Sequence, residues 1–384
     1  MSSVLNRSGT GHGRSARWEV GGEFDRREVP VGPFLPWPTP HRLYGLAQHA
    51  LIAMWEALPV TPVRTLHVPD YFCPEVVTAW RHHGIRLQRY LDDPRWPEPD
   101  WSSLEPEAGD AVLAVNYFGV RGDGGWARWR RSHPELLLVE DHSHDPHSRW
   151  ARRSIADYAF ASLRKTFAVS DGAILWSPRG AQLPGAPSES RANGSDLKLA
   201  AMVLKHDYLA GGEVDREAYR ALQIRGERDL LASSPSAITP WSSHIVERGL
   251  PTIWRDHRRR NVRALIRLVA GAVTIRPLFT SWPRGHCPFN LVLLFASEPS
   301  RDACRAHLIE QRIYPPVHWA QPPDASQRAR DLASVILTIP ADQRYGSSDM
   351  RSVAAALMSF DEERQTRRGR PRVPVAHSSS RGAR

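Results

Sequence analysis

A lysine at position 165 lies in the segment SLRKTFAVSDGA, between two stretches that we expect to be strands, residues 157–163 and 172–178. The chain has 51 basic residues, yet lysine occurs only at positions 165, 198 and 205. Arginine cannot lose a proton to form an imine, so each lysine retained in such a chain is informative. We expect Lys198 and Lys205, seven positions apart on one helical face, to be surface residues. Lys165 is therefore the candidate for covalent amine chemistry.

Two further side chains suit the same chemistry. Asp141 ends the apolar run LLLVED, where a buried carboxylate is costly unless it meets a cation such as a protonated pyridine. It could otherwise cap a following helix. Ser162 precedes Lys165 by three residues and could bond a phosphate. Pyridoxal 5'-phosphate (PLP) needs a lysine for its aldehyde, an acid for its ring nitrogen and donors for its phosphate, and these residues supply candidates for all three.

The elements around these residues predict an α/β fold. A helix expected at residues 41–58 is followed by short apolar runs that alternate with helical stretches as far as residue 178. Strands separated by helices indicate a mostly parallel sheet covered on both faces, and ligands of such sheets gather at the carboxyl ends of the strands. Tyr71, Asn116 and Asp141 follow three of these runs.

Composition limits the other possibilities. We divide the 384 residues into a flexible leader (1–25), a large domain (26–270), a smaller α+β domain (271–360) and a basic tail (361–384). The net charge of +10 owes much to that tail, and no recognised nucleic-acid-binding motif accompanies it, so nucleic-acid binding is not expected. We also expect no membrane span, because no apolar run approaches the roughly 20 residues required. Three cysteines without a CxxC pair suit a reducing cytoplasm.

Residues 35 to 360 resemble the DegT/DnrJ/StrS family, the sugar-aminotransferase-like branch of PLP fold type I enzymes. The resemblance is carried, in family order, by HVPDYFCPEVVTAWRHHGIRLQRYLDD, AVLAVNYFGV, LLLVEDHSHD and DYAFASLRKTFAVSDGAIL. It implies an aspartate-aminotransferase-like fold and a homodimer. It also implies Asp141 on the pyridine nitrogen, His144 beside the ring hydroxyl, Lys165 as imine and proton shuttle, and an aromatic residue near Tyr71 stacked on the ring.

The chain departs from the family where the phosphate is bound. Leu46, Ala47 and Gln48 stand where most members have Ser-Gly-Thr at the start of the first helix. Backbone amides of a helix N-terminus can still bind a phosphate, so Ala47 and Gln48 stay candidates together with Ser162. The family's Asn-Tyr-Arg segment, which reaches across the dimer, has no clear counterpart.

These observations favour an aminotransferase that moves an amino group from an amino acid to a keto substrate, either a keto-sugar or an intermediate of secondary metabolism. Asn116 and Arg344 are candidate substrate contacts, Arg344 because an anionic substrate group would need an arginine. A PLP-dependent lyase or dehydratase, or a catalytically idle protein of this fold, also fits. A metal-dependent hydrolase is a remote alternative, because HSHDPH places His142, His144 and His147 at close spacing.

Overall fold

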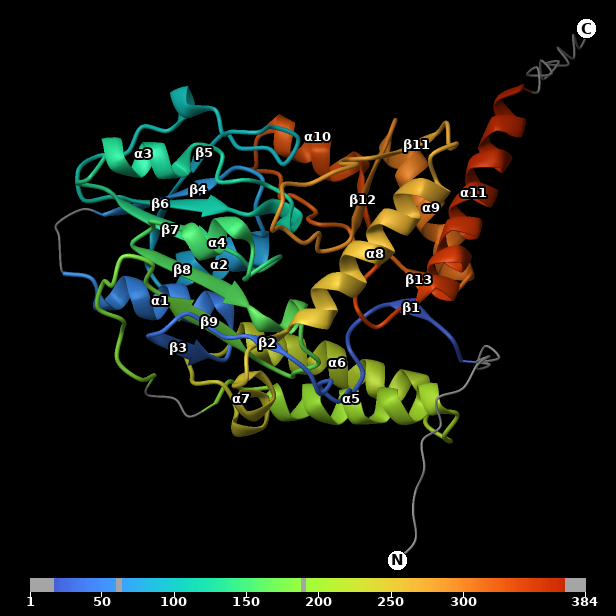
Figure 1. The fold of residues 1–384 in the computed structure, drawn as a ribbon, viewed down its shortest axis with the longest axis horizontal. Coiled ribbons are helices and arrows are strands. Elements are labelled where there is room, and N and C mark those ends of the chain that lie inside the picture. Colours follow the sequence, from blue (N-terminus) through green and yellow to red (C-terminus); the bar gives the residue numbers. More distant parts are fainter. Residues whose placement is uncertain (1–16, 60–63, 188–190, 370–384) are drawn as a thin grey trace, which may run out of the picture.

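The fold is built on a seven-stranded sheet. The computed structural model describes residues 17–59, 64–187 and 191–369 (Figure 1). The strand order is β3-β9-β8-β7-β6-β4-β5. These strands are β3 (His41–Tyr44), β4 (Thr65–Pro69), β5 (Arg86–Tyr90), β6 (Ala111–Val115), β7 (Leu137–Asp141), β8 (Tyr158–Ser162) and β9 (Ala173–Trp176). The pairs from β5 to β8 are parallel, whereas β9 and β3 are antiparallel to their neighbours. The expected mostly parallel sheet is confirmed.

Helices cover the sheet and connect its strands. They include α1 (Ala47–Ala57), α2 (Pro74–His82), α3 (Trp126–Ser132), α4 (Arg149–Arg153) and α7 (Pro240–Val246). The helix that we expected from residue 41 begins only at Ala47, because residues 41–44 pair with β9 as an edge strand. Helix α7 is followed by α8 (Thr252–Leu268), and Gly249 and Pro251 separate the two helices.

A second unit contains a three-stranded antiparallel sheet in the order β11-β12-β14. Its elements are β11 (Ile275–Pro277), β12 (Leu291–Phe295), α9 (Glu298–Glu310), β13 (Ile313–Tyr314), α10 (Gln327–Val335), β14 (Ile336–Ile339) and α11 (Ser347–Gly369). Val262 and Leu265 of α8 belong to the hydrophobic cluster of this unit, so α8 connects the two sheets. Helix α11 continues to Gly369, so the predicted start of the tail at 361 is too early.

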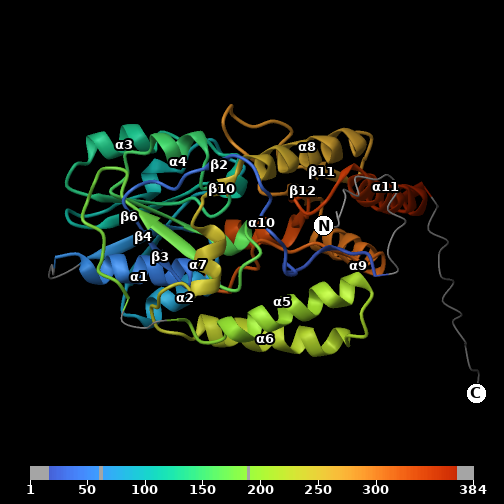
Figure 2. The same cartoon turned by 60° about the horizontal axis from the view of Figure 1, so that its bottom comes forward.

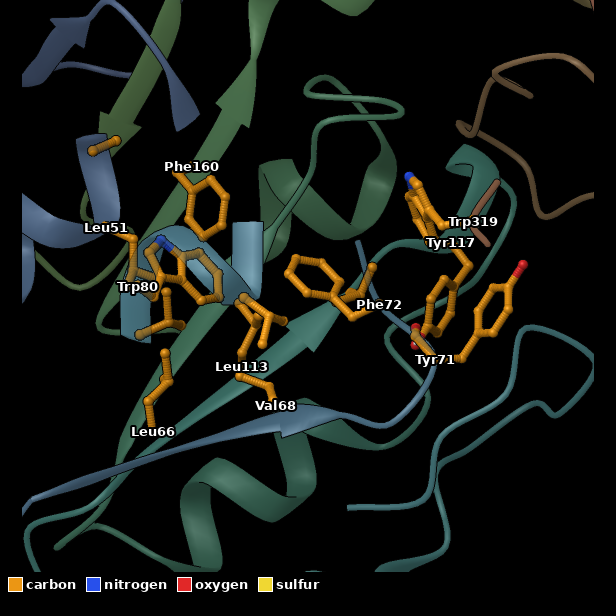
Figure 3. Packing of buried hydrophobic residues seen from close by; sticks show 14 of the residues in the cluster. Leu51, Leu66, Val68, Tyr71, Phe72, Trp80, Leu113, Tyr117, Phe160 and Trp319 are labelled. Atoms are coloured by element: carbon orange, nitrogen blue, oxygen red, sulfur yellow. The ribbon is translucent and has the colours of Figure 1, made fainter. Parts of the chain in front are cut away.

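Aromatic packing connects the core of the large sheet to its carboxyl edge (Figure 3). Trp80 of α2 meets Phe160 of β8 edge to face at 6.5 Å, and Phe72 stacks on Trp80 at 5.7 Å. Phe72 also contacts Trp319, which belongs to the loop after β13, at 6.1 Å. Edge-to-face and offset-stacked rings are favourable arrangements beyond the apolar area they bury. This packing fixes the position of the chain that leaves β4.

Residues 1–16 of the expected flexible leader lie outside the described residues, whereas residues 17–25, which we call the N-terminal strap, pack against the rest of the molecule. Strand β1 (Val20–Gly21) pairs with β13, and Val20 is fully buried. The Gly21 N–H donates to the Tyr345 hydroxyl at 2.7 Å, and Lys205 donates to the Glu23 carbonyl at 2.7 Å. Lys205 belongs to α5 (Ser195–Ala210), which lies beside α6 (Arg216–Leu231) along one side of the molecule (Figure 2). The strap therefore links the small unit to this helix pair.

Within the described residues, none of the helices is both long and apolar enough to cross a bilayer.

Candidate functional site

The candidate nucleophile stands where β8 ends. Ser162 closes β8, and a short 3-10 helix, η3 (Leu163–Lys165), follows it at once. The Lys165 Nζ lies 3.1 Å from Nε2 of His144. It also lies 5.5 Å from the ring centre of Trp319 and 5.9 Å from that of Phe289. Strand position thus brings together Lys165 and His144, which stand 21 residues apart in the sequence.

The hydrogen bonds of His144 define its tautomer. Its Nδ1 accepts the Phe118 N–H at 2.9 Å, so the neutral ring carries its hydrogen on Nε2, which faces Lys165. Burial, and then the nearby charge of Lys165, hold the pKa of His144 well below its usual value. The neutral ring therefore presents its Nε2–H to Lys165 Nζ, and it can donate to that nitrogen whenever the amine is uncharged. The electron pair of the uncharged amine is the one with which it attacks a carbonyl.

A tight turn aims the Phe118 N–H at His144. Phe118 and Gly119 both have positive φ angles, 53° and 72°. A Cβ at position 119 would collide with the Cys287 carbonyl oxygen, so only glycine fits. The Phe118 ring stacks on His144 at 5.6 Å, and Phe289 stacks on it at 4.6 Å. Packing and the hydrogen bond from Phe118 together fix the imidazole.

A cavity of about 390 Å³, the inner cavity, opens beside Lys165. Its wall includes Ala47, Gln48, Phe72, Asn116, Asp141, Ser143, His144, Ser162, Lys165, His318 and Trp319. The Asp141 carboxylate accepts the Ser143 N–H at 2.7 Å through Oδ1, which leaves Oδ2 for a ligand. Asn116 is 1% exposed, and neither its amide nitrogen nor its amide oxygen has a hydrogen-bond partner among the described residues. A buried polar side chain without a partner is costly, so Asn116 indicates a missing ligand.

A second cavity, the outer cavity, has a volume of about 690 Å³ and lies between the N-terminal strap and the small unit. Gly22 and Glu23 of the strap line it, as do Arg305 and Pro315 on the opposite side. Five residues line both cavities: Ser162, Arg164, Lys165, Glu227 and His318. Lys165 therefore stands where the two cavities meet.

Tyr71 does not take the position that the resemblance implied. Its ring packs against those of Tyr117 and Trp319, at 6.2 and 5.7 Å (Figure 3). Its hydroxyl donates to the His318 carbonyl. Phe72 and Trp319 line the inner cavity, whereas Tyr71 does not. The two neighbouring aromatic residues point in different directions, and the expectation chose the one that faces the core.

Arg344 reaches the outer cavity, but its donors are already used. It forms a two-pronged ion pair with Asp342, at 2.9 and 2.8 Å, and it donates to the carbonyls of Gly22 and Glu23 at 3.3 Å. Its role in the structure is to hold the strap. The predicted contact with substrate is therefore not available without breaking this buried pair.

Lys198 and Lys205 are buried, each only 3% exposed, so the expectation that they lie on the surface was wrong. Lys198 bonds Glu23 at 2.5 Å and Glu227 at 2.9 Å, and Lys205 bonds Glu19 at 2.6 Å. Helical spacing correctly places both lysines on one face of α5. That face is covered by α6 and the strap.

His318 is a site residue that sequence reasoning missed. It lines both cavities, its Nδ1 lies 3.0 Å from the Thr338 hydroxyl, and burial followed by the charge of Lys165 lowers its pKa to about 3. It belongs to PPVHW, a histidine and a tryptophan among prolines, to which we assigned no element. This pairing of polar and aromatic residues in a loop was the signal available.

The three histidines considered for a metal centre do not converge. His142 bonds Glu140 at 2.8 Å, His144 bonds Lys165, and His147 stacks on Trp37 at 5.0 Å. The part of the chain that the structure describes contains no group of three or more His, Cys, Asp or Glu side chains that could hold a metal ion. The metal-dependent hydrolase hypothesis therefore has no support in the structure.

Comparison with known proteins identifies the fold. No family model matches the sequence, and no curated protein matches it. Among solved structures, the chain is similar to the aminotransferase TlmJ from Streptoalloteichus hindustanus, with a TM-score of 0.56, 17% identity and coverage of 85% of this chain and 86% of that chain. It is similar to the PMP-form of the putative sugar aminotransferase Spr1654 from Streptococcus pneumoniae, with a TM-score of 0.58, 15% identity and coverage of 86% of this chain and 88% of that chain. It is also similar to DesV of S. venezuelae in complex with a ketimine intermediate, with a TM-score of 0.55, 18% identity and coverage of 84% of this chain and 85% of that chain. The chain therefore has the PLP fold type I architecture that we expected.

Proposed function

We propose that this protein is a PLP-dependent aminotransferase of the DegT/DnrJ/StrS type, with Lys165 as its catalytic residue. The observation that carries the proposal is the position of Lys165 at the junction of two cavities, with its Nζ 3.1 Å from Nε2 of His144. The inner cavity is suited to the cofactor and the outer cavity to the second reactant. The shared fold with aminotransferases supports this division.

The residues of the inner cavity fit PLP. Asp141 offers a carboxylate oxygen for the protonated ring nitrogen, and the unpartnered amide of Asn116 offers a donor and an acceptor to the ring substituents. The side chains of Phe72 and Trp319 supply apolar surface for a flat ring. The first amides of α1 and the Ser162 hydroxyl are the donors for the phosphate. These residues would meet the three requirements of the cofactor, and His144 would lie beside the ring hydroxyl.

When bound, PLP supplies an aldehyde that captures amines and a ring that withdraws electrons from the carbon next to the captured amine. Asp141 would keep a proton on the ring nitrogen, which would make this withdrawal effective. Lys165 Nζ would hold the aldehyde and, when free, would be the group placed to take a proton from the Cα of the amino donor as a base and to give it back as an acid.

Neutral histidines keep Lys165 competent for this work. His144 and His318 both remain uncharged because burial lowers their pKa values, so neither repels the developing positive charge on Lys165. His144 holds the amine in one orientation between proton transfers. The stacked rings of Phe118 and Phe289 exclude water from the imidazole. We infer that His144 is a positioning residue.

The outer cavity favours a substrate with an anionic group. Besides Lys165, four cationic side chains line it, those of Arg164, Lys198, Arg305 and Arg344. Three carboxylates oppose them, those of Glu23, Glu227 and Asp342. Within the described residues Arg305 has no carboxylate partner, and its Nε donates only to the Pro315 carbonyl, at 3.3 Å. A keto-sugar that carries a phosphate would fit this surplus of positive charge. We propose such a substrate, an amino acid as donor, a homodimer and a cytoplasmic location.

A half-reaction tests the proposal. The PLP-loaded protein is incubated with single amino acids, including glutamate and glutamine, and the products are analysed by mass spectrometry. We expect a stoichiometric amount of one 2-keto acid from the wild type and none from Lys165→Arg, which keeps the charge but cannot form the imine. Release of ammonia together with the keto acid would favour a lyase. Binding of PLP without turnover of any amine would indicate an idle protein of this fold.

A further inference from the structure

The start of α1 offers backbone amides but no side-chain cap. Leu46 is the N-cap and makes no side-chain cap bond, and the first bond of the helix runs from the Ala50 N–H to the Leu46 carbonyl at 3.2 Å. The N–H groups of Ala47, Gln48 and His49 therefore have no acceptor within the helix. The Gln48 side chain is turned away, because its amide donates to the Leu231 carbonyl at 3.1 Å. Three backbone amides at the positive end of a helix thus remain without a charged partner for a phosphate.

Arg164 lies next to this site. It lines the inner cavity and pairs with Glu227 through both of its terminal nitrogens, one of them at 3.2 Å. Glu227 and Leu231 are four residues apart on α6 and so lie on one face, about 6 Å apart along the axis. Because Leu231 accepts the hydrogen bond of Gln48 while Glu227 pairs with Arg164, one face of α6 contacts both residues, and both line the inner cavity.

Glu227 has a second cationic partner. Lys198 reaches it at 2.9 Å and also reaches Glu23 of the strap, at 2.5 Å. The two cations together lower the pKa of Glu227 to about 2, so its carboxylate is charged. If an anion took Arg164, Glu227 would stay neutralised by Lys198. Lys198 would then serve both Glu227 and Glu23, and because the Glu23 side chain is exposed, the exchange leaves no buried charge unpaired, which is the usual obstacle to opening an ion pair away from water.

We propose that Arg164 replaces the hydroxyl residues missing from the phosphate cup, and that it binds the cofactor's phosphate with the α1 amides while Glu227 passes to Lys198. This inference rests on the proposed PLP function. A second observation in the same cavity, the unpartnered amide of Asn116, independently indicates that a ligand belongs there. The guanidinium also matches a phosphate geometrically, because its planar donors can bond two oxygens at once.

The experiment compares the affinity of the ligand-free protein for PLP and for pyridoxal, which lacks the phosphate. Both are measured by titration of the visible absorbance band. Arg164→Gln should raise the Kd for PLP about 10- to 100-fold, as expected for loss of a charge-assisted contact, and leave the Kd for pyridoxal within about twofold. Arg164→Lys should recover part of the loss. Glu227→Gln should leave PLP binding unchanged or tighten it, because it removes a carboxylate that competes for Arg164.

The control is Arg225→Gln, an exposed arginine of α6 that pairs with Asp229 and lies outside both cavities. It should alter neither affinity. Inorganic phosphate gives a readout without the cofactor, because it should raise the thermal midpoint of the wild type and fail to do so for Arg164→Gln. If Arg164 and Glu227 served only as a structural pair, Arg164→Gln and Glu227→Gln would both weaken the affinity for PLP and for pyridoxal to the same extent. That result would overturn the inference. Failure of the proposed function is distinguishable, because neither aldehyde would then produce an absorbance band in the wild type.

Discussion

Replacing Asn116 by leucine should stabilise the ligand-free protein and weaken its affinity for PLP. The Asn116 side chain is 1% exposed, and its amide nitrogen and oxygen have no partner among the described residues. An unmade hydrogen bond of a buried group costs about 1–3 kcal/mol, and leucine has a similar size without the polar atoms. We therefore expect Asn116→Leu to raise the free energy of unfolding of the ligand-free protein by about 1–3 kcal/mol. Loss of one or two neutral hydrogen bonds to the ligand should raise the Kd for PLP about 5- to 30-fold.

The assay is urea denaturation followed by circular dichroism, carried out without ligand and again with saturating PLP. The matched control is Asn261→Leu, because Asn261 is also buried but donates to the carbonyls of Asp342 and Tyr345 at 3.0 and 2.9 Å. That control should lose about 1–3 kcal/mol, since it leaves two buried carbonyls unsatisfied. If Asn116→Leu destabilised the ligand-free protein as Asn261→Leu does, the reasoning that Asn116 awaits a ligand would be refuted.

Three further predictions concern two buried histidines, the turn at Gly119 and the ion pair between Lys205 and Glu19. His147 and His318 are buried with pKa values lowered to about 3, so they stay neutral in the folded protein, whereas the same residues in the unfolded chain bind protons near pH 6.5. The free energy of unfolding should therefore fall as the pH drops from 6.5 toward 3, by about 1.4 kcal/mol per pH unit for each histidine. Urea denaturation at a series of pH values measures this slope. A slope that is unchanged in His147→Asn would contradict this. Gly119→Ala should cost about 2–3 kcal/mol of stability and weaken PLP binding, because it displaces the turn that orients His144; unchanged affinity would argue against that role. Lys205→Met should leave Glu19 buried without its cation and cost about 3 kcal/mol, and limited proteolysis should then cut within the strap, whereas a strap that stays resistant would assign its stability to β1.

The sequence predicted the fold and the place of the candidate nucleophile in it because both depend on local order. Alternating strands and helices indicate a parallel sheet, and Lys165 and Asp141 each follow a strand that ends at the same edge. These features need only the pattern of apolar residues and the direction of each strand. The same reasoning placed Asn116 at that edge, without showing that its amide is unpartnered.

Contacts between distant segments were not predictable in this way. Helical spacing put Lys198 and Lys205 on one face of α5, but only the position of the N-terminal strap shows that this face is buried. Similarly, the choice between Tyr71 and Phe72 depends on where Trp319 lies, and Trp319 comes from the second unit of the chain. His318 reaches Lys165 from that same loop. Each of these residues is positioned by a segment more than 100 residues away, and no local pattern records that.

The central claim is that Lys165 carries the cofactor, and covalent mapping tests it most directly. The protein is incubated with PLP, reduced with borohydride, digested and analysed by mass spectrometry, alongside Lys165→Ala. Mapping is simple because the chain contains only three lysines, at 165, 198 and 205. We predict a visible absorbance band and a reduced adduct at Lys165, both lost in Lys165→Ala. An adduct at Lys198 or Lys205 alone, or a protein that gains neither band nor adduct, would contradict the proposed function.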